Sequence, residues 1–375
     1  MSKAEAGIVP SFLFFAYGCG QVVNGILCKR YNVKWMIFIG LFVSACINLV
    51  LAFAPSFAVI KWLWALNGFM LSLLWPTLIR LLSESLPQKK LSTSAVVMGT
   101  PVALGTLLVY GTSSLFAAFQ KFRYSFYLAA FYGMAVSVLW LVFFSRATER
   151  AVREKSTEEG EISVRKEGGT PASKPVPRTL FFATVGILCF FAVGINLARD
   201  GLSTWLPAIL KEEFFFSDSL SILLTLFLPL LATFANAFAL FVHKKIPDYV
   251  FHSVAGFGFI AVLVGVIVGS LALKLAAVLI LCLIAVNFLA SSMNSLLTSI
   301  FPLFMRDAVS SGMIAGVLNG FCYLGSTLSS YGLGAIADSF GWTSVFWTLI
   351  AFCLLTFVIG AAYAVLRRSI RKKDA

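Results

Sequence analysis

The sequence predicts an all-α integral membrane protein built from two helix bundles. Hydrophobic residues make up 59% of the 375 residues and charged residues only 12%, and the mean hydropathy is +0.92. A water-soluble fold of this length needs more polar surface than such a composition supplies. The apolar residues gather in stretches of membrane length, and these lack the alternating polarity of a β-barrel strand.

Eleven such stretches are predicted to be transmembrane helices. A helix needs roughly 20 apolar residues to cross a hydrocarbon core of about 30 Å, and the stretch 35–53 is nearly all Ile, Leu, Val, Phe and Ala. The predicted helices lie at about 8–28, 35–55, 59–82, 93–118, 124–145, 179–206, 217–242, 249–270, 272–297, 309–335 and 343–366.

The distribution of basic residues predicts the orientation. Most of the 29 Lys and Arg residues fall in every second connection and in the C-terminal tail. Basic residues of short loops are retained on the cytoplasmic side, so we expect a cytoplasmic C-terminus and an N-terminus outside. The net charge of +13 is then explained by this bias and by anionic lipid headgroups, and nucleic-acid binding is not expected.

One long hydrophilic stretch, 146–178, divides the chain and is predicted to be a cytoplasmic linker. It separates an N-terminal bundle of five helices (1–145) from a C-terminal bundle of six (179–375). Leu104-Gly105-Thr106-Leu107-Leu108 recurs six helices later as Leu324-Gly325-Ser326-Thr327-Leu328, as expected for two repeated bundles. Ser2 and Glu5 have the pattern of a capping box. We therefore expect a twelve-helix plan from which the first helix is absent.

Four groups of residues resemble the major facilitator superfamily, and within it the organophosphate:phosphate antiporter branch of bacterial glycerol-3-phosphate and hexose-phosphate transporters. These groups span most of the chain: Ala16-Tyr17-Gly18 with Gly25 and Arg30-Tyr31-Asn32-Val33-Lys34; Trp75-Pro76 with Arg80; Asn196-Leu197-Ala198-Arg199-Asp200-Gly201 with Trp205, Pro207 and Lys211-Glu212; and Tyr323-Leu324-Gly325. The resemblance implies that Arg199 is the substrate arginine of the seventh helix and that Tyr323 faces the cavity. It also implies a bacterial plasma membrane protein.

The sequence departs from that branch at four places. Gln21 stands where the phosphate transporters carry a basic residue, and Lys29 replaces the aspartate of the signature loop. The cavity histidine has no counterpart in Gly99-Thr100-Pro101, and the first-helix arginine would lie upstream of Met1. These departures favour an organic anion in general over phosphate in particular.

Arg199 stands out on physical grounds as well. A charged side chain inside a transmembrane helix costs about 2.5–3.5 kcal/mol unless it faces a wet cavity, and a guanidinium donates two parallel hydrogen bonds to a carboxylate or phosphate. We therefore expect Arg199 to bind an anionic substrate. A second interpretation, left open, is that Arg199 reaches the outer interface, where Asp200 and Lys211 also lie. Because Asp200 is adjacent in sequence, it is expected to point about 100° away and to face outward.

Further polar residues are candidates for substrate binding or for plain helix-to-helix hydrogen bonds. The candidates are Tyr17, Gln21, Asn196, Asn319 and Tyr323. The cytoplasmic loops that begin Lys29-Arg30 and Lys244-Lys245 are six helices apart and are predicted gating loops. Gly99, Gly105, Gly316, Gly320 and Gly325 are predicted to be close-packing sites.

The predicted function is secondary active transport of a small organic anion by alternating access, with a phosphorylated metabolite as one option. All acidic residues except Asp200 fall in loops, termini or helix ends, which favours antiport over proton symport. Alternatives are an exporter of a non-anionic solute or drug, and a truncated product that does not transport. No enzyme, cofactor or metal site is expected, because no nucleophile–base pair or ligand cluster is present. The expected partners are the anion and membrane lipids, and we expect a monomer.

Overall fold

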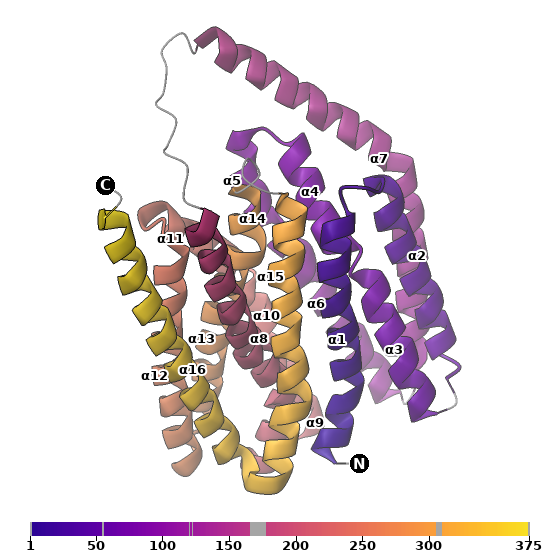
Figure 1. The fold of residues 1–375 in the computed structure, drawn as a ribbon. Coiled ribbons are helices and arrows are strands. Elements are labelled where there is room, and N and C mark those ends of the chain that lie inside the picture. Colours follow the sequence, from indigo (N-terminus) through magenta and orange to yellow (C-terminus); the bar gives the residue numbers. More distant parts are fainter. Residues whose placement is uncertain are drawn as a thin grey trace.

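The computed structural model describes residues 2–54, 56–119, 121, 123–165, 178–304 and 310–373, and all regular secondary structure in them is helical (Figure 1). Each of the eleven predicted stretches coincides with one or more helices. The elements are α1 (Lys3–Leu27), α2 (Val33–Leu51), α3 (Phe57–Leu71), α4 (Leu74–Ser85), α5 (Gln88–Val97), α6 (Gly99–Ala118), α7 (Arg123–Arg165), α8 (Arg178–Phe214), α9 (Asp218–Thr225), α10 (Phe227–Ala232), α11 (Ala235–Lys245), α12 (Tyr249–Ala272), α13 (Ala276–Ser295), η1 (Leu296–Ile300), α14 (Phe301–Phe304), α15 (Ser311–Leu328), η2 (Ser329–Leu333) and α16 (Gly334–Lys373).

The all-α membrane fold is confirmed, whereas the count of eleven crossings stays a prediction. Within the described residues, nine helical spans are long and apolar enough to cross a membrane, and the stretch 93–118 is not among them. One of the nine, Ser311–Ser369, covers two predicted stretches. It turns at Gly341, whose φ of 76° and ψ of 173° form a backbone conformation open essentially to glycine alone.

Helix ends follow local chemistry. The Ser2 hydroxyl accepts from the Glu5 amide, and the Glu5 carboxylate accepts from the Ser2 amide, so the predicted capping box is present. Several predicted stretches are interrupted where helices meet: α3 ends before α4, and the seventh stretch is divided into α9, α10 and α11. Two segments, η1 and η2, are π-helical, a form found mostly at functional places in helices.

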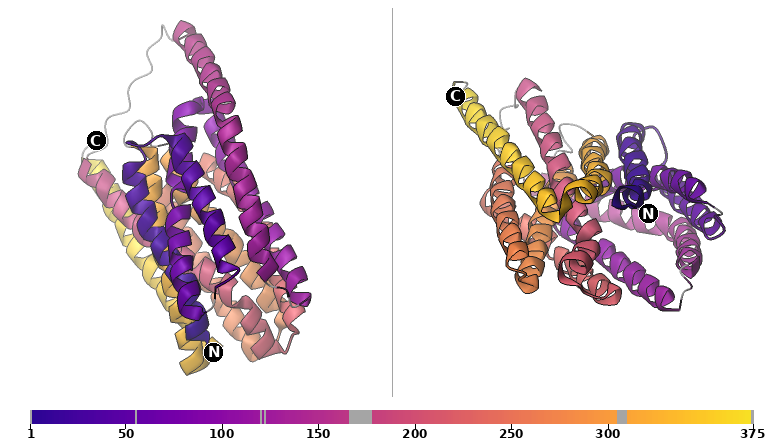
Figure 2. Two further views of the ribbon diagram at one scale, coloured as in Figure 1. Left: turned by 90° about the vertical axis from the view of Figure 1, so that its right-hand side faces the viewer. Right: turned by 90° about the horizontal axis from the view of Figure 1, so that it is seen from below.

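Helices of the two sequence halves gather on opposite sides when the molecule is seen from below (Figure 2). In the first half α1 packs on α3 and α2 on α7, and in the second half α12 packs on α13 and α16. The main contact between the halves is α1 against α15. Gly316 of α15 makes this approach close, because a Cβ there would lie 2.8 Å from Gly25 Cα. The exact domain boundaries stay a prediction.

The predicted close-packing role holds for some glycines and not for others. Cβ atoms added at Gly320 and Gly325 would also collide with facing helices, the latter 2.1 Å from the Val193 carbonyl oxygen. Gly105 has nothing within 4 Å of its Cβ position. Its predicted packing role is therefore wrong within the described residues, and the side-chain surroundings of Gly99 lie outside them.

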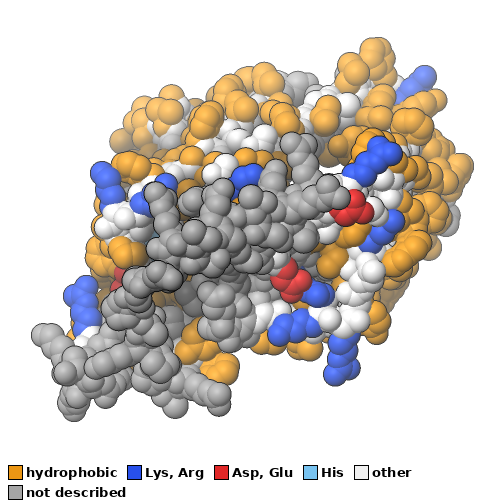
Figure 3. All heavy atoms as spheres, turned by 90° about the horizontal axis from the view of Figure 1, so that it is seen from above, with side chains coloured by type: hydrophobic (Ala, Val, Ile, Leu, Met, Phe, Trp, Pro, Cys, Tyr) orange, Lys and Arg blue, Asp and Glu red, His pale blue; other side chains and the backbone are white. Residues whose placement is uncertain are grey.

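One end of the molecule carries the basic loops. Lys29, Arg30, Lys244 and Lys245 are exposed at the end that also carries the C-terminus (Figure 1), and Lys and Arg side chains ring this face in Figure 3. The predicted linker begins differently from the expectation, because α7 continues as a helix through its first part to Arg165. Its central part, 166–177, and Arg306 lie outside the described residues.

Hydrogen bonds and ion pairs join the halves at both ends. At the basic end the Ser83 and Ser311 hydroxyl oxygens, from α4 and α15, lie 2.5 Å apart. At the opposite end Asp338 accepts from the backbone amides of Lys3 and Ala4 at 3.2 and 2.9 Å. The Lys3 ammonium also pairs with Glu212 at 3.2 Å.

Candidate functional site

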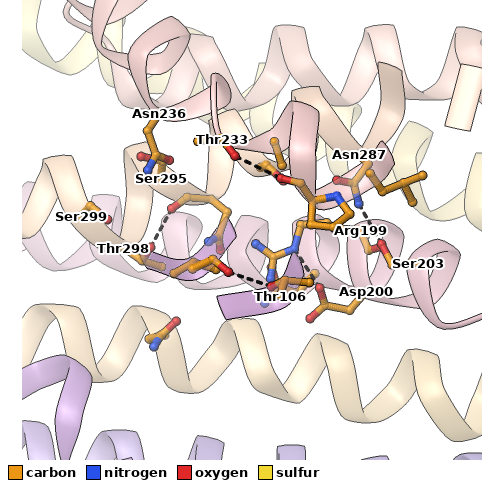
Figure 4. A pocket seen from close by; sticks show the side chains of 18 of the residues that line it. Thr106, Arg199, Asp200, Ser203, Thr233, Asn236, Asn287, Ser295, Thr298 and Ser299 are labelled. Carbon is orange, nitrogen blue, oxygen red and sulfur yellow. Dashed lines mark hydrogen bonds and ion pairs between the residues drawn. The ribbon is translucent and has the colours of Figure 1, made fainter. Parts of the chain in front are cut away.

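A cavity of about 420 Å³ lies between the two halves, and Figure 4 shows it from close by. A cavity of this size holds a small metabolite. Its walls come from α1, α4, α6, α8, α9, α10, α11, α13, η1 and α15, with Met98 between α5 and α6. The lining residues that bear on function are Tyr17, Trp75, Thr106, Tyr110, Asn196, Arg199, Asp200, Ser203, Asn236, Asn287, Asn294, Thr298, Asn319 and Tyr323.

Arg199 and Asp200 are the charged residues among the described cavity walls. Arg199 Nε donates to Asp200 Oδ1 at 2.8 Å, and the two side chains are only 22% and 18% exposed. Figure 4 shows them turned toward each other. The expectation that Asp200 faces outward is therefore wrong, because the long Arg199 side chain folds back far enough to reach a neighbour in sequence. Arg199 likewise lines the cavity.

Asp200 also receives a hydrogen bond from the neighbouring helix α15. The Ser326 hydroxyl of α15 donates to Asp200 Oδ2, and Asn196 Nδ2 of α8 donates to that same hydroxyl oxygen at 3.5 Å. Both oxygens of the Asp200 carboxylate thus have partners. Within the described contacts Arg199 uses Nε for its ion pair, so the paired terminal nitrogens of its guanidinium remain for a ligand.

The backbone beneath Arg199 is held by a neighbouring helix. Asn287 Nδ2 of α13 donates to Ser203 Oγ of α8 at 2.8 Å. Ser203 in turn donates to the carbonyl oxygen of Arg199 at 2.8 Å. Asn287 is 5% exposed, so this contact is sheltered from solvent. Such hydrogen bonds across helices fix the turn of α8 that presents the guanidinium.

Two tyrosines from opposite halves meet at the cavity wall. The rings of Tyr17 on α1 and Tyr323 on α15 have centroids 4.2 Å apart at an angle of 46°. Asn319 lies one helical turn before Tyr323 on α15 and also lines the cavity. The structure thus brings together five of the six predicted binding residues, Arg199, Tyr17, Asn196, Asn319 and Tyr323, and their role in binding stays a prediction.

Gln21 differs from the other candidates. Its side chain is fully buried and is not part of the cavity wall. Neither of its amide atoms has a hydrogen-bond partner among the described residues. The reason is its position on α1, where the close approach to α15 encloses it: its carbonyl oxygen would lie 2.4 Å from a Cβ at Gly316.

The sequence interpretation missed the contribution of the ninth predicted helix, 272–297. Asn287, Asn294, Ser295 and Thr298 from α13 and η1 all line the cavity. Asparagines inside an otherwise apolar stretch are themselves a signal, because an amide in hydrocarbon needs a partner or water. Thr106 of α6 was also missed, and a lone threonine in a membrane helix gives no such signal.

The arrangement suits reversible binding of a small polar solute. Amide and hydroxyl groups supply neutral hydrogen-bond donors and acceptors, and Arg199 supplies a fixed positive charge. The described residues hold no group of three His, Cys, Asp or Glu side chains that fits a metal ion. Non-covalent contacts of these kinds are what fix the orientation of a small ligand in a pocket.

Comparison with known proteins agrees with this. The Major Facilitator Superfamily profile matches residues 1–330. A glycerol-3-phosphate transporter of Bacillus subtilis is 23% identical over 95% of this chain and 83% of that protein. A probable hexose phosphate transport protein of Chlamydia pneumoniae is 29% identical over 28% of this chain, and the match spans 24% of that relative, about a quarter of its length.

The fold has a solved counterpart. The structure of the human organic anion transporter MFSD10 (TETRAN) matches with a TM-score of 0.67 and 14% identity, covering 95% of this chain and 83% of that chain. At this identity the likeness concerns the fold. Together with the profile match over most of the sequence, it shows that the chain belongs to the Major Facilitator Superfamily and is an integral membrane transporter rather than an enzyme.

Proposed function

We propose that this protein carries a small organic anion across the membrane by alternating access, with Arg199 binding the anionic group. The observation that carries the proposal is the position of Arg199, which lines the cavity between the halves and uses Nε for its ion pair. A guanidinium can then offer its terminal nitrogens to a carboxylate or phosphate in a planar fork. The names of two relatives, transporters of glycerol-3-phosphate and hexose phosphate, support an anionic and phosphorylated substrate class.

The proposed orientation follows from the charges. The end that carries Lys29, Arg30, Lys244 and Lys245 is proposed to be cytoplasmic, together with the C-terminus, because basic residues of short loops are retained there. The bacterial relatives support a plasma membrane location. These loops lie at the cavity's cytoplasmic end in this orientation, which is where gating loops of an alternating-access carrier belong.

The expected mode of coupling has to be revised. Antiport was predicted because no carboxylate was expected at the centre of the membrane. Asp200 lines the cavity, so that premise does not hold, and anion exchange remains one of two modes. The second mode is joint movement of the anion with a proton.

The test is binding of defined anions to the purified protein. The melting temperature is measured with glycerol-3-phosphate, glucose 6-phosphate, glucuronate and inorganic phosphate, since a ligand at 100 times its Kd adds about 2.7 kcal/mol to stability. Arg199→Ala should abolish the shift in melting temperature. Arg199→Lys should keep part of the shift, because lysine retains the positive charge but lacks the two parallel donors of the guanidinium. A matched control is Lys274→Ala, because this cation pairs with Glu213 at 2.9 Å away from the cavity. An anion shift that is unchanged in Arg199→Ala would contradict the proposal.

One observation favours a second candidate, export of a cationic solute or drug. The Asp200 carboxylate lines the cavity and could bind a cation in the place of Arg199. Tetraphenylphosphonium in the same melting experiment separates the two. Stabilisation by this cation that is lost in Asp200→Asn, with no response to the four anions, would favour the exporter.

A further inference from the structure

We propose that Asp200 is the internal counter-anion of Arg199 and takes up one proton when a substrate anion binds, so that anion and proton move together. The inference rests on the proposed function, because it presumes that the anion binds at Arg199. It concerns a carboxylate that the sequence placed outside the site, and it makes proton coupling the second of the two modes.

The geometry gives Asp200 the position that a substrate anion would take. Its Oδ1 accepts from Arg199 Nε at 2.8 Å, and its Oδ2 accepts from the Ser326 hydroxyl. The carboxylate therefore occupies one side of the guanidinium and one hydroxyl of the neighbouring helix α15. A ligand that uses the terminal nitrogens of Arg199 must lie next to this carboxylate or push it aside.

Among the titratable groups around the ion pair, Asp200 is the one that can change its charge near neutral pH. The titratable side chains near it are Arg199 on its own helix, Tyr323 and Cys322 on α15, and Tyr110 on α6, with Tyr17 on α1 beside Tyr323. Tyrosines, cysteines and arginines ordinarily keep one protonation state between about pH 5 and pH 8. In contrast, a carboxylate that lies next to a second negative charge can take up a proton in this pH range.

The charge balance sets the expected stoichiometry. Without substrate, the positive Arg199 and the negative Asp200 cancel within the described cavity wall. A bound monoanion would leave one negative charge in excess, and at about 4 Å and an effective dielectric constant of about 20 such repulsion changes proton affinity roughly 1,000-fold. One proton from water then binds the Asp200 carboxylate and restores neutrality. The loaded and the empty carrier have the same net charge, and the proton leaves with the anion on the other side.

The geometry points to a singly charged anion as the best fit. A dianion would leave one negative charge in the cavity even after Asp200 is protonated, whereas a carboxylate or a singly protonated phosphate would not. This refines the substrate class from anions in general to monoanions. It also agrees with the departure at Gln21, which stands where the phosphate transporters carry a basic residue.

The experiment measures glucuronate affinity of the full-length protein between pH 5.5 and 8. Glucuronate is chosen because its carboxylate stays ionised in this range, whereas a phosphate titrates near pH 6. We expect wild-type affinity to fall up to tenfold per pH unit as pH rises, and a weakly buffered sample to take up close to one proton for each anion bound. Asp200→Asn should bind with an affinity that does not depend on pH and should take up no proton.

Ser326→Ala provides a second variant that keeps both charges. It removes the hydroxyl that stabilises the ionised carboxylate, so the pH at which glucuronate affinity declines should move upward. Melting temperatures without ligand show whether each variant is folded. If Asp200→Asn is unfolded, two other results test whether Asp200 takes up the proton. These are the shifted pH dependence of glucuronate affinity in Ser326→Ala and the proton uptake of the wild type.

The outcomes separate this inference from the proposed function. Binding that requires Arg199 but shows the same pH dependence in wild type and Asp200→Asn, with no proton uptake, would overturn the coupling and leave the anion carrier standing. Absence of any anion binding in wild type and in Asp200→Asn at every pH would overturn both. In proteoliposomes, glucuronate entry driven by an inward proton gradient, and lost in Asp200→Asn, is the result expected for joint movement.

Discussion

The position of the Arg199 guanidinium depends on residues that do not contact it directly. Asn287 of α13 donates to Ser203 Oγ, and Ser203 donates to the Arg199 carbonyl oxygen. The side chain that would bind the anion therefore depends on a hydrogen bond between two helices. Truncating Asn287 removes this bond without removing either charge.

Asn287→Ala is expected to weaken anion affinity about threefold, because hydrogen bonds between membrane helices contribute about 0.6 kcal/mol on average. Titration of the melting temperature with the anion that stabilises the wild type measures this. Thr348→Ala is the control, since the Thr348 hydroxyl bonds to the Ser344 carbonyl oxygen of its own helix on an exposed part of α16. Equal affinity losses in the two variants would mean that the Asn287 contact has no special role.

At the scale of single residues, the sequence predicted that Arg199 lines the cavity but misplaced its neighbour Asp200. Arg199 is conspicuous because a cation in an apolar stretch is costly. Asp200 was judged by the 100° step between adjacent helical positions, a rule that applies to Cβ directions and not to the ends of flexible side chains. Gln21 was misplaced for another reason: the close approach of α15 encloses it, and no single-helix pattern contains that information.

At the scale of elements, the contact of α1 with α15 is made by backbones rather than side chains. A Cβ at Gly316 would lie 2.4 Å from the Gln21 carbonyl oxygen, and one at Gly25 would lie 3.0 Å from the Gly312 carbonyl oxygen. Backbone atoms cannot move aside as a flexible side chain would. Small residues of this kind let membrane helices approach closely.

Gly316→Ala is therefore expected to destabilise the protein by about 1–3 kcal/mol, the usual cost of overpacking, and to lower its melting temperature. Gly265→Ala is the matched control, because this glycine also lies inside a helix, α12, and has nothing within 4 Å of its Cβ position. A melting temperature that falls equally in both variants would show that loss of glycine, and not the collision, is responsible.

The positions of the helices could be predicted from the lengths of the apolar stretches, but the interruptions within them could not. Each predicted stretch coincides with helix because backbone groups in lipid must be satisfied within the segment. The interruption between α3 and α4, the division into α9, α10 and α11, and the π-helical η1 and η2 depend on what packs against those turns. Thr298 and Ser299 of η1 line the cavity, so this irregularity lies at the candidate site.

At the scale of the whole molecule, the two halves are joined at both ends of the cavity. Ser83 meets Ser311 at the basic end, and Asp338 holds the start of α1 at the other. An alternating-access carrier must break one set of contacts at a time as its halves rock about the central site. The repeat of Leu104–Leu108 in Leu324–Leu328 pointed to two halves, whereas these joining contacts could not be read from either copy alone.

A disulfide across the basic end is expected to stop transport. Cysteines at 83 and 311 replace two hydroxyl oxygens that lie 2.5 Å apart, which suits the short reach of a disulfide. Cys28 is replaced by Ala in this variant, because its sulfur lies 2.7 Å from the Cβ position of Gly312 and could pair wrongly. Oxidation should abolish anion uptake into proteoliposomes, and dithiothreitol should restore it, since the bond prevents the halves from separating at that end.

The control pair places cysteines at 44 and 67, where Ser44 Oγ and Asn67 Oδ1 lie 2.6 Å apart on α2 and α3 of one half. Its disulfide stays within one rigid unit, so uptake should survive oxidation. Protection of the new thiols from a maleimide reagent shows how completely each pair has closed. Full closure of the 83–311 pair with undiminished uptake would mean that the halves do not part at the basic end. Transport would then need a pathway other than rocking about Arg199, because the cavity would have no second opening.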